Sequence, residues 1–218
     1  MFVILFLFFQ RLVIVRSILS FIYQWFVFVP IGVLSTVITA VLVMIGGTFS
    51  KKNRWGCILP RYWSKILCRI ALCRIKVKSN TNLDPNQSYI FVANHQGAFD
   101  IFLTYGYLNL NIKWVQKYEL RRLPFVGKAS EMAGHIFVDS SSRKACVDTI
   151  EKAEQELQKG DSIVIFPEGA RSRTGKMARF KKGAYLIATQ MQLPIVPITL
   201  NGPFNVLKRG SANVSFGQ

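Results

Sequence analysis

The first quarter of the chain is almost uniformly apolar. No charged residue occurs between Ser17 and Ser50, across 34 positions. A straight helix of that length extends about 50 Å, whereas the hydrocarbon core of a bilayer is about 30 Å thick. No small-residue cleavage site follows the segment, and its apolar part is too long for a signal peptide. The pattern therefore predicts a retained membrane segment.

The middle of this segment contains Pro30-Ile31-Gly32, where a helix kinks or turns. Two arrangements fit: a single tilted span with an interfacial extension, or a helical hairpin whose arms meet near Pro30. Basic residues flank both ends of the segment, which favours the hairpin because both ends then face the same side. We expect residues 1–55 to form a membrane anchor, as a hairpin, and residues 56–218 to form a separate domain.

Beyond the anchor, short apolar runs alternate with amphipathic stretches. The apolar runs predict strands at 89–93, 113–115, 135–138, 162–166, 195–200 and 213–216. The amphipathic stretches predict helices at 64–74, 142–159 and 182–191, and Gly160 is placed to end the second of these. Strands that alternate with helices indicate an α/β fold, here a mixed sheet flanked by helices.

The net charge indicates what kind of partner the protein binds. The chain carries +17, and removing Arg11 and Arg16 leaves +15 on residues 51–218. Such a charge indicates an anionic partner: membrane lipid, nucleic acid or phosphorylated small molecules. Nine lysines and arginines lie between Lys51 and Lys78 with no acid among them. This cluster directly follows the apolar segment and favours an anionic membrane surface, with the domain on the cytoplasmic side of the inner membrane.

Two other classes of partner are not expected. The chain lacks the aromatic-basic interleaving of a known nucleic-acid module, so we expect no nucleic-acid partner. A membrane-tethered nucleic-acid binder is retained only as a distant alternative. The chain has two histidines, and its cysteines form no Cys-x-x-Cys pair, so no structural metal site is expected. The cysteines are predicted to be free thiols of the cytoplasm: Cys57, Cys68, Cys73 and Cys146.

The first candidate for chemistry is Asn94-His95-Gln96-Gly97-Ala98-Phe99-Asp100, directly after a predicted buried strand. Strand ends are where α/β folds place catalytic side chains. A turn across Gly97 can bring the Asp100 carboxylate to the His95 imidazole. The carboxylate then fixes the tautomer and leaves the other ring nitrogen as a general base. No nucleophilic Ser or Cys is evident, so the simplest nucleophile is a hydroxyl of the substrate.

The second candidate is Phe166-Pro167-Glu168-Gly169-Ala170-Arg171-Ser172-Arg173, which also follows a predicted strand. The planar fork of Arg171 suits phosphate oxygens, and Gly169 allows close approach of the backbone. Further basic residues follow without an intervening acid, as far as Lys182. The stretch predicts a phosphate-binding loop.

Four motifs together resemble those of the 1-acyl-sn-glycerol-3-phosphate acyltransferases, within the glycerolipid acyltransferase superfamily. The first is Asn94-His95 with Asp100, and the third is Phe166 to Ser172. The second is Lys117-Tyr118-Glu119-Leu120 followed by Leu123-Pro124-Phe125-Val126-Gly127 and Gly134 to Asp139, and the fourth is Pro194 to Ile198. The resemblance covers roughly residues 60–218 and is specific for the superfamily more than for the substrate.

The resemblance implies an enzyme with the fold of that superfamily. His95 would deprotonate the sn-2 hydroxyl of lysophosphatidic acid, and Asp100 would orient His95. Acyl-CoA or an acyl carrier protein would donate the acyl chain, and the product would be phosphatidic acid. Arg171 would hold the acceptor phosphate, with Glu168 and Gly169 shaping the turn. No metal or dissociable cofactor is implied.

The same resemblance implies roles for further residues. Lys117 is a second candidate for the phosphate, Pro197 belongs to the side of the acyl donor, and His135 is structural. Ala170 replaces the usual Thr and loses one hydroxyl, and Ser140 to Ser142 separate Asp139 from Arg143, where the family often has Arg directly after Asp. Lyso-ornithine lipid and lysophosphatidylglycerol are therefore kept as alternative acceptors.

Overall fold

A computed structural model describes residues 14–49, 55–79, 82–138 and 143–218. The Ser140 to Ser142 stretch and the first three basic residues after the apolar segment, Lys51, Lys52 and Arg54, lie outside these ranges. The helices and strands occur in this order: η1 (Gln24–Phe28), α2 (Val29–Phe49), α3 (Trp55–Ile70), β1 (Ile90–Ala93), α4 (Phe99–Tyr107), β2 (Ile112–Lys117), η2 (Tyr118–Arg122), α5 (Val126–Met132), β3 (Ile136–Val138), α6 (Arg143–Gln158), β4 (Ser162–Ile165), α7 (Gly183–Met191), β5 (Ile195–Ile198) and α8 (Pro203–Val206).

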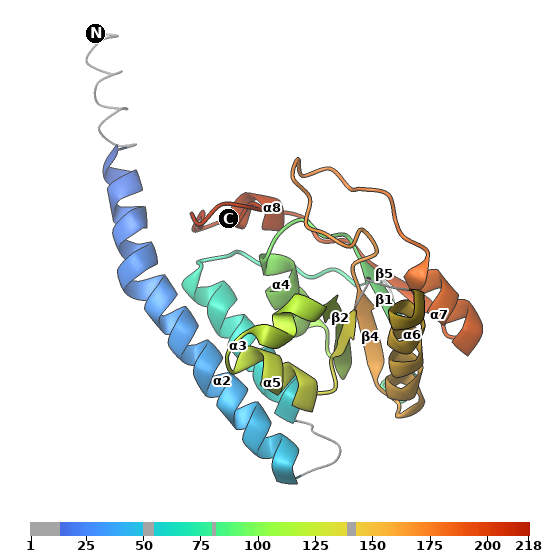
Figure 1. The fold of residues 1–218 in the computed structure, drawn as a ribbon. Coiled ribbons are helices and arrows are strands. Elements are labelled where there is room, and N and C mark those ends of the chain that lie inside the picture. The colour runs from blue at the N-terminus through green and yellow to red at the C-terminus, as the bar shows by residue number, and fades with distance from the viewer. Residues whose placement is uncertain (1–13, 50–54, 80–81, 139–142) are drawn as a thin grey trace.

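The centre of the fold is a five-stranded sheet in the order β3-β2-β4-β1-β5 (Figure 1). Every pairing in it is parallel, with Ile90 of β1 opposite Ile163 of β4 and Ile195 of β5. The α/β class is confirmed, but the sheet is parallel where we predicted a mixed one. All residues of β1 and β4 are buried, as expected for strands covered on both faces.

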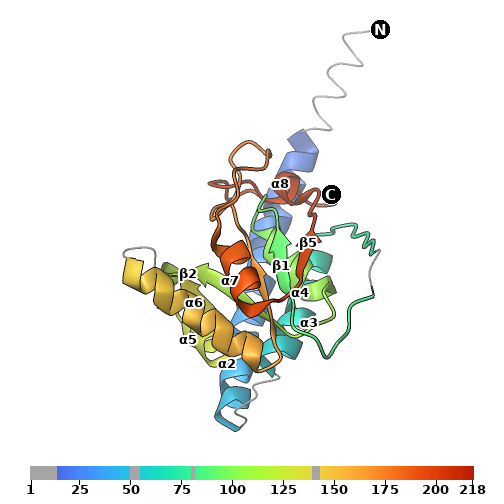
Figure 2. The same ribbon diagram turned by 90° about the vertical axis from the view of Figure 1, so that its right-hand side faces the viewer.

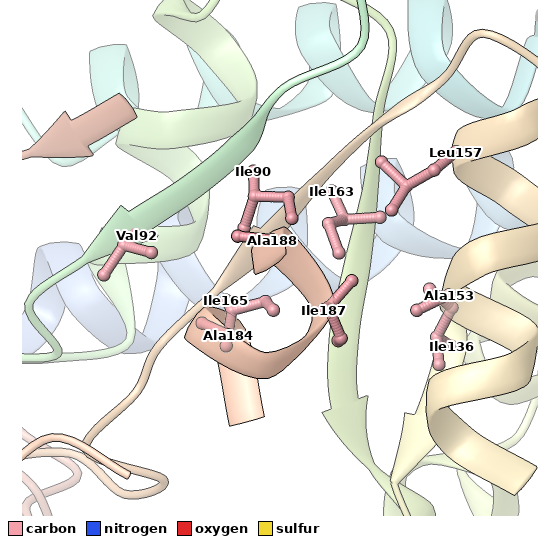
Figure 3. Packing of buried hydrophobic residues seen from close by; sticks show 10 residues of the cluster. All are labelled: Ile90, Val92, Ile136, Ala153, Leu157, Ile163, Ile165, Ala184, Ile187 and Ala188. Carbon is pink, nitrogen blue, oxygen red and sulfur yellow. The ribbon is translucent and has the colours of Figure 1, made fainter. Parts of the chain in front are cut away.

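Helices cover both faces of the sheet. Because side chains alternate along a strand, Ile90 and Val92 point to one face and Phe91 to the other. The first face packs against α6 and α7, which lie in front of the sheet in Figure 2. Figure 3 shows this cluster, which consists of Ile90, Val92, Ile136, Ala153, Leu157, Ile163, Ile165, Ala184, Ile187 and Ala188. The opposite face packs against α4 through Tyr105.

The N-terminal apolar segment forms one continuous helix from Ile14 to Phe49, so the predicted hairpin turn near Pro30 is wrong. Proline normally breaks a helix because its ring clashes with the carbonyl four residues earlier. Here the preceding turn, η1, is a π-helix, in which the Val29 amide donates to the carbonyl oxygen of Gln24, five residues back. This wider turn accommodates Pro30 without reversing the chain.

This helix packs along the domain through a stripe of small residues. Ala40 and Val43 of α2 contact Ala129 and Ala133 of α5. At Gly46, an added Cβ would lie 2.6 Å from the ring of Trp55, so only glycine permits this approach of α2 and α3. The helix is long and apolar enough to cross a membrane, and only 11% of its most apolar window is buried. The division into an anchor and a domain at residue 55 stays a prediction.

The predicted strand at 213–216 is absent. The backbone of this segment is hydrogen-bonded to the Gln24 side chain and not to a neighbouring strand. The Gln24 amide nitrogen donates to the Ala212 carbonyl at 2.7 Å, and the Gln24 amide oxygen accepts from the Val214 N–H at 2.9 Å. Gln24 is buried, and Phe28 and Phe216 pack beside it in an edge-to-face contact. The apolar helix and the C-terminal segment are therefore joined through a polar side chain.

His135 is structural, as predicted. Its Nδ1 accepts from the Trp114 N–H at 3.3 Å, so its Nε2 carries the proton and donates to the Tyr105 hydroxyl at 2.6 Å. Burial lowers the pKa of His135 to about 3, with a further lowering from the Lys113 ammonium. The imidazole is therefore neutral in the folded protein and joins β2, β3 and α4.

Stability is expected to fall as the pH drops below 6.5. Between pH 6.5 and about 3, His135 is protonated in the unfolded chain but stays neutral in the folded protein. Each pH unit in this range therefore lowers the free energy of unfolding by up to about 1.4 kcal/mol. Thermal unfolding in detergent, followed by tryptophan fluorescence between pH 7.5 and 5, measures this. His135→Asn can still accept from Trp114, and its melting temperature should depend less on pH. Equal pH dependence in both proteins would contradict the assignment.

Candidate active site

The predicted site residues gather at the carboxyl edge of the sheet. His95 follows β1, Phe166 to Lys182 follow β4, and Lys117 is the last residue of β2. Because β2, β4 and β1 are parallel neighbours, their ends lie side by side. This is the edge at which open parallel sheets bind ligands.

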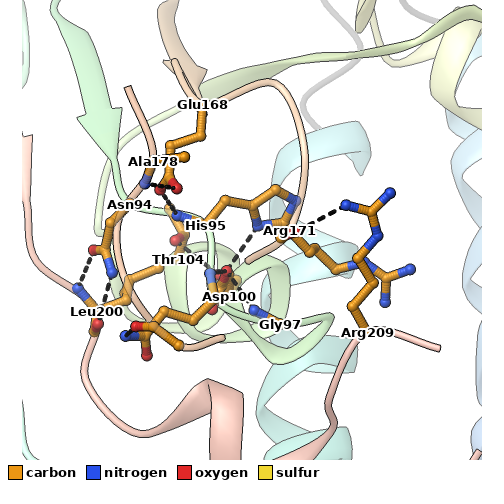
Figure 4. A network of polar contacts seen from close by, with 12 residues as sticks. Asn94, His95, Gly97, Asp100, Thr104, Glu168, Arg171, Ala178, Leu200 and Arg209 are labelled. Atoms are coloured by element: carbon orange, nitrogen blue, oxygen red, sulfur yellow. Dashed lines mark hydrogen bonds and ion pairs between the residues drawn. The ribbon is translucent and has the colours of Figure 1, made fainter. Parts of the chain in front are cut away.

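The His95 imidazole is held by a buried carboxylate. Its Nδ1 lies 2.7 Å from Oδ2 of Asp100, whose side chain is fully buried. The same oxygen accepts from the backbone N–H groups of Gln96 and Gly97, at 2.5 and 2.9 Å. Three donors on one oxygen stabilise the charged carboxylate. Asp100 therefore holds the proton on Nδ1 and leaves the Nε2 lone pair of His95 available as a base (Figure 4).

An aromatic ring sets the plane of the imidazole. The rings of His95 and Phe166 are stacked, with centroids 4.0 Å apart and an angle of 8° between the planes. Trp114 stacks in turn beside Phe166, with centroids 5.4 Å apart. Asp100 fixes one nitrogen and Phe166 fixes the ring plane, so His95 has little freedom left. About 14% of its side chain is exposed.

Two polar side chains tie the loops around His95 together. The Asn94 amide both donates to the Leu200 carbonyl and accepts from the Leu200 N–H, at 3.0 and 2.7 Å, and so joins the ends of β1 and β5. The Glu168 carboxylate accepts from the His95 N–H and from the Ala178 N–H, each at 2.7 Å. Glu168 thus holds the loop after β4 against the loop after β1 (Figure 4), and its role in substrate binding stays a prediction.

Gly169 makes the turn after β4 possible. Its φ is +73°, in the region that L side chains rarely adopt, and its amide donates to the Phe166 carbonyl at 3.0 Å. A Cβ at this position would lie 2.8 Å from the Lys181 ammonium. The glycine therefore permits both the turn and the approach of a cationic side chain.

Two arginines lie together beside this turn. Arg171 is half-buried, and its carbonyl accepts from the Arg209 guanidinium at 3.1 Å. The next amide, of Ser172, donates to the His95 carbonyl at 2.8 Å, so the Arg171 backbone is attached to the His95 loop. Lys117 is exposed at the same edge. The structure thus brings Arg171 and Glu168 against the His95 loop, with Lys117 at the end of β2.

A hollow of about 170 Å³ opens next to His95. It lies between the ends of β1 and β5 and the loop after β4, and is lined by Asn94, His95, Gln96, Glu168, Ser172, Gly175, Lys176, Met177, Thr199, Leu200 and Asn201. In the described part of the chain, no group of three or more His, Cys, Asp or Glu side chains is arranged to hold a metal ion.

The contacts of three residues in the site are not predictable from the sequence alone. Asn94 belongs to a motif but shows its function only once Leu200 lies beside it. Phe166 reads as the end of a strand, and only the fold places its ring on His95. Arg209 follows a segment that carries no motif, and no signal in the sequence places it beside Arg171.

Comparison with known proteins finds acyltransferases. The family model described as Acyltransferase matches residues 74–201. A chloroplastic 1-acyl-sn-glycerol-3-phosphate acyltransferase from Arabidopsis thaliana is 28% identical over 86% of this chain and 54% of its own length. The 1-acyl-sn-glycerol-3-phosphate acyltransferase from Helicobacter pylori is 32% identical over 73% of this chain and 66% of its own.

The fold also has a close counterpart among solved structures. The 1-acyl-sn-glycerophosphate acyltransferase PlsC from Thermotoga maritima superposes with a TM-score of 0.76, at 24% identity, over 92% of this chain and 80% of that one. The chain spans little more than half the length of the plant and algal relatives that it matches. The family model nevertheless covers more than half of this chain, from Arg74, ahead of β1, to Asn201, just beyond β5, and the chain belongs to the acyltransferase family.

Proposed function

We propose that this protein transfers a fatty acyl group from acyl-CoA or an acyl carrier protein to the sn-2 hydroxyl of lysophosphatidic acid. The product is phosphatidic acid, and the place of the reaction is phospholipid biosynthesis. The His95–Asp100 pair beside a basic loop carries this proposal, because it offers a base for a hydroxyl next to groups for a phosphate. Relatives named as 1-acyl-sn-glycerol-3-phosphate acyltransferases support it.

The reaction begins at Nε2 of His95. The sn-2 hydroxyl gives its proton to this nitrogen while the oxygen attacks the thioester carbonyl carbon. The resulting imidazolium is stabilised by the buried Asp100 carboxylate, which already accepts the hydrogen bond from Nδ1. No nucleophile from the protein is needed, since the acceptor supplies its own oxygen.

The reaction ends when the thiol leaves. The tetrahedral intermediate expels the thiolate, so one carbon–oxygen ester bond forms and one carbon–sulfur bond breaks. The imidazolium returns its proton to the thiolate, and His95 is neutral again for the next cycle. Because the ring is stacked on Phe166, the same nitrogen remains positioned for both proton transfers.

The acceptor phosphate is held by the basic side chains at the same edge. Arg171 offers a planar pair of donors, and Lys117 offers a point charge at the end of β2. The turn at Gly169 and the hydrogen bonds of the Glu168 carboxylate to the His95 and Ala178 amides keep Arg171 next to the His95 loop. A phosphate bound there leaves the glycerol hydroxyl close to His95.

The apolar helix supplies the membrane side of the reaction. Exposed apolar side chains lie along its whole described length: Ile14, Val15, Ile18, Leu19, Phe21, Ile22, Trp25, Phe26, Ile31, Val33, Leu34, Ile38, Leu42, Ile45 and Phe49. The helix contacts the domain from Gln24 to Gly46, so lipid can cover the exposed side chains while the domain stays outside the hydrocarbon. We place the protein on the cytoplasmic side of the inner membrane, on an anionic lipid surface.

Acceptor and donor can be identified together. Purified protein in detergent is incubated with lysophosphatidic acid, lysophosphatidylglycerol and lyso-ornithine lipid, each with acyl-CoA and with acyl carrier protein, and products are measured by mass spectrometry. We expect phosphatidic acid as the main product. A main product from another lysolipid, unchanged when lysophosphatidic acid is added, would disprove the proposed acceptor.

Replacing the base is expected to remove most of the activity. His95→Ala should lower kcat by about 10²- to 10⁴-fold, the range supplied by a positioned general base. Asp100→Asn should lower it as well, because a neutral amide stabilises the imidazolium less. Initial rates at saturating substrates measure both, and unchanged melting temperatures confirm the fold. Substantial activity in folded His95→Ala would rule out this mechanism.

The orientation can be tested by protease protection. A tag after Gln218 should be digested in inside-out membrane vesicles and protected in right-side-out ones, because the basic domain is expected to face the cytoplasm. Immunoblots of the tag with and without detergent give the measurement. Digestion in right-side-out vesicles would place the domain on the other side of the membrane.

A further inference from the structure

Arg209 lies in a hydrogen-bonded turn after α8. The Ser211 N–H donates to the Lys208 carbonyl at 3.1 Å and closes a four-residue turn with Arg209 at its second position. Gly210, at the third position, has a φ of +82°, as a type II turn requires. The turn presents Arg209 outward, and its exposed side chain reaches the Arg171 carbonyl.

The segment that follows this turn is held from two sides. The Ser215 N–H donates to the Val206 carbonyl at 2.8 Å, and the buried Gln24 amide binds the backbone at Ala212 and Val214. The backbone that carries Arg209 is thus anchored to α8 and to the N-terminal helix. The backbone at Arg209 therefore has little conformational freedom left to lose when the side chain binds a ligand.

The charge of the two arginines is not balanced by nearby acids. Within the ranges that the structure describes, no carboxylate forms an ion pair with Arg171 or Arg209. The acids of the site are engaged elsewhere: Asp100 with His95, and Glu168 with the amides of His95 and Ala178. The Arg209 guanidinium lies against the backbone of a second arginine and neither is paired with a carboxylate among the described residues, which is the arrangement that attracts an anion from solution.

The described hydrogen bond of Arg209 uses only part of its N–H donors. A guanidinium has five N–H donors, and the described contact to Arg171 uses one of them. Figure 4 shows this contact as a dashed line from the Arg209 guanidinium to the backbone of Arg171. The remaining donors take part in no described contact and are available to an anion.

We propose that Arg171 and Arg209 form a two-arginine clamp that selects a terminal phosphate monoester on the acceptor. A monoester carries about −1.5 to −2 charges and three acceptor oxygens, enough for two guanidinium forks. A phosphodiester headgroup carries one charge and two free oxygens and satisfies only one fork well. This inference rests on the proposed function and deepens it, because it explains how lysophosphatidic acid is preferred over lysophosphatidylglycerol.

Equilibrium binding without acyl donor tests the clamp directly. Lysophosphatidic acid and lysophosphatidylglycerol are titrated in detergent micelles against wild type, Arg209→Met, Arg209→Lys and Arg171→Met. Arg209→Met should weaken binding of the monoester about 10-fold or more, since a hydrogen bond between charged partners contributes at least that factor. Binding of the diester should change far less, so the preference falls. Arg209→Lys keeps the charge and should lie between wild type and Arg209→Met.

Lys208→Met is the matched control. Lys208 precedes Arg209 and carries the same charge, but its ammonium lies 5.4 Å from the centroid of the Phe204 ring. Its loss should leave the monoester preference unchanged. An equal loss for both lipids in Arg209→Met would show that Arg209 only supports the loop, and no loss would show that it is idle. Either result overturns the clamp.

Kinetics separate the clamp from the proposed function. In the active enzyme, Arg209→Met should raise KM for lysophosphatidic acid and leave kcat within a few-fold, because the residue binds the phosphate and not the reacting atoms. If wild type binds the monoester preferentially through Arg209 but forms no acylated product, the proposed activity fails and the clamp stands. If it forms phosphatidic acid with an unchanged KM in Arg209→Met, the clamp fails and the activity stands.

Discussion

The site depends on one buried carboxylate. Asp100 is fully buried, lies in the first turn of α4 and accepts three hydrogen bonds on a single oxygen. An ionised group in the interior is tolerated only with such partners, and the helix N-terminus adds a favourable dipole. The turn from His95 to Gly97 takes its shape from these bonds. The imidazole, the backbone amides and the start of α4 therefore form one unit.

Around that unit, each strand end contributes a different element of the site. β1 leads to the base, β4 to the glycine turn and Arg171, and β5 to Leu200, which Asn94 holds in place. The stacked ring of Phe166 connects the first two of these. The chemistry is thus distributed over separate loops, and a parallel sheet brings them together because all its strands end at one edge.

Much of this is readable from the sequence, and what is not has a common cause. Apolar runs locate the strands, and the spacing of His95 and Asp100 implies their contact, since both depend on local patterns. The segment at 213–216 looks like a strand locally, but its partner is Gln24, 190 residues away. Pro30 likewise predicts a turn from local sequence. The helix continues because the preceding turn is π-helical, and no sequence pattern marks that geometry. Long-range contacts and rare backbone geometry decided these cases.

The buried Gln24 has a consequence for how the protein sits in lipid. Its amide meets its hydrogen-bonding needs only on the C-terminal segment, and turning it into hydrocarbon would leave those groups unsatisfied. The apolar helix therefore cannot roll about its axis or separate from the domain without that penalty. In the proposed arrangement on a lipid surface, the depth of the helix would then also set the height of Arg209 above the acyl chains, because Gln24 fixes the C-terminal segment to the helix.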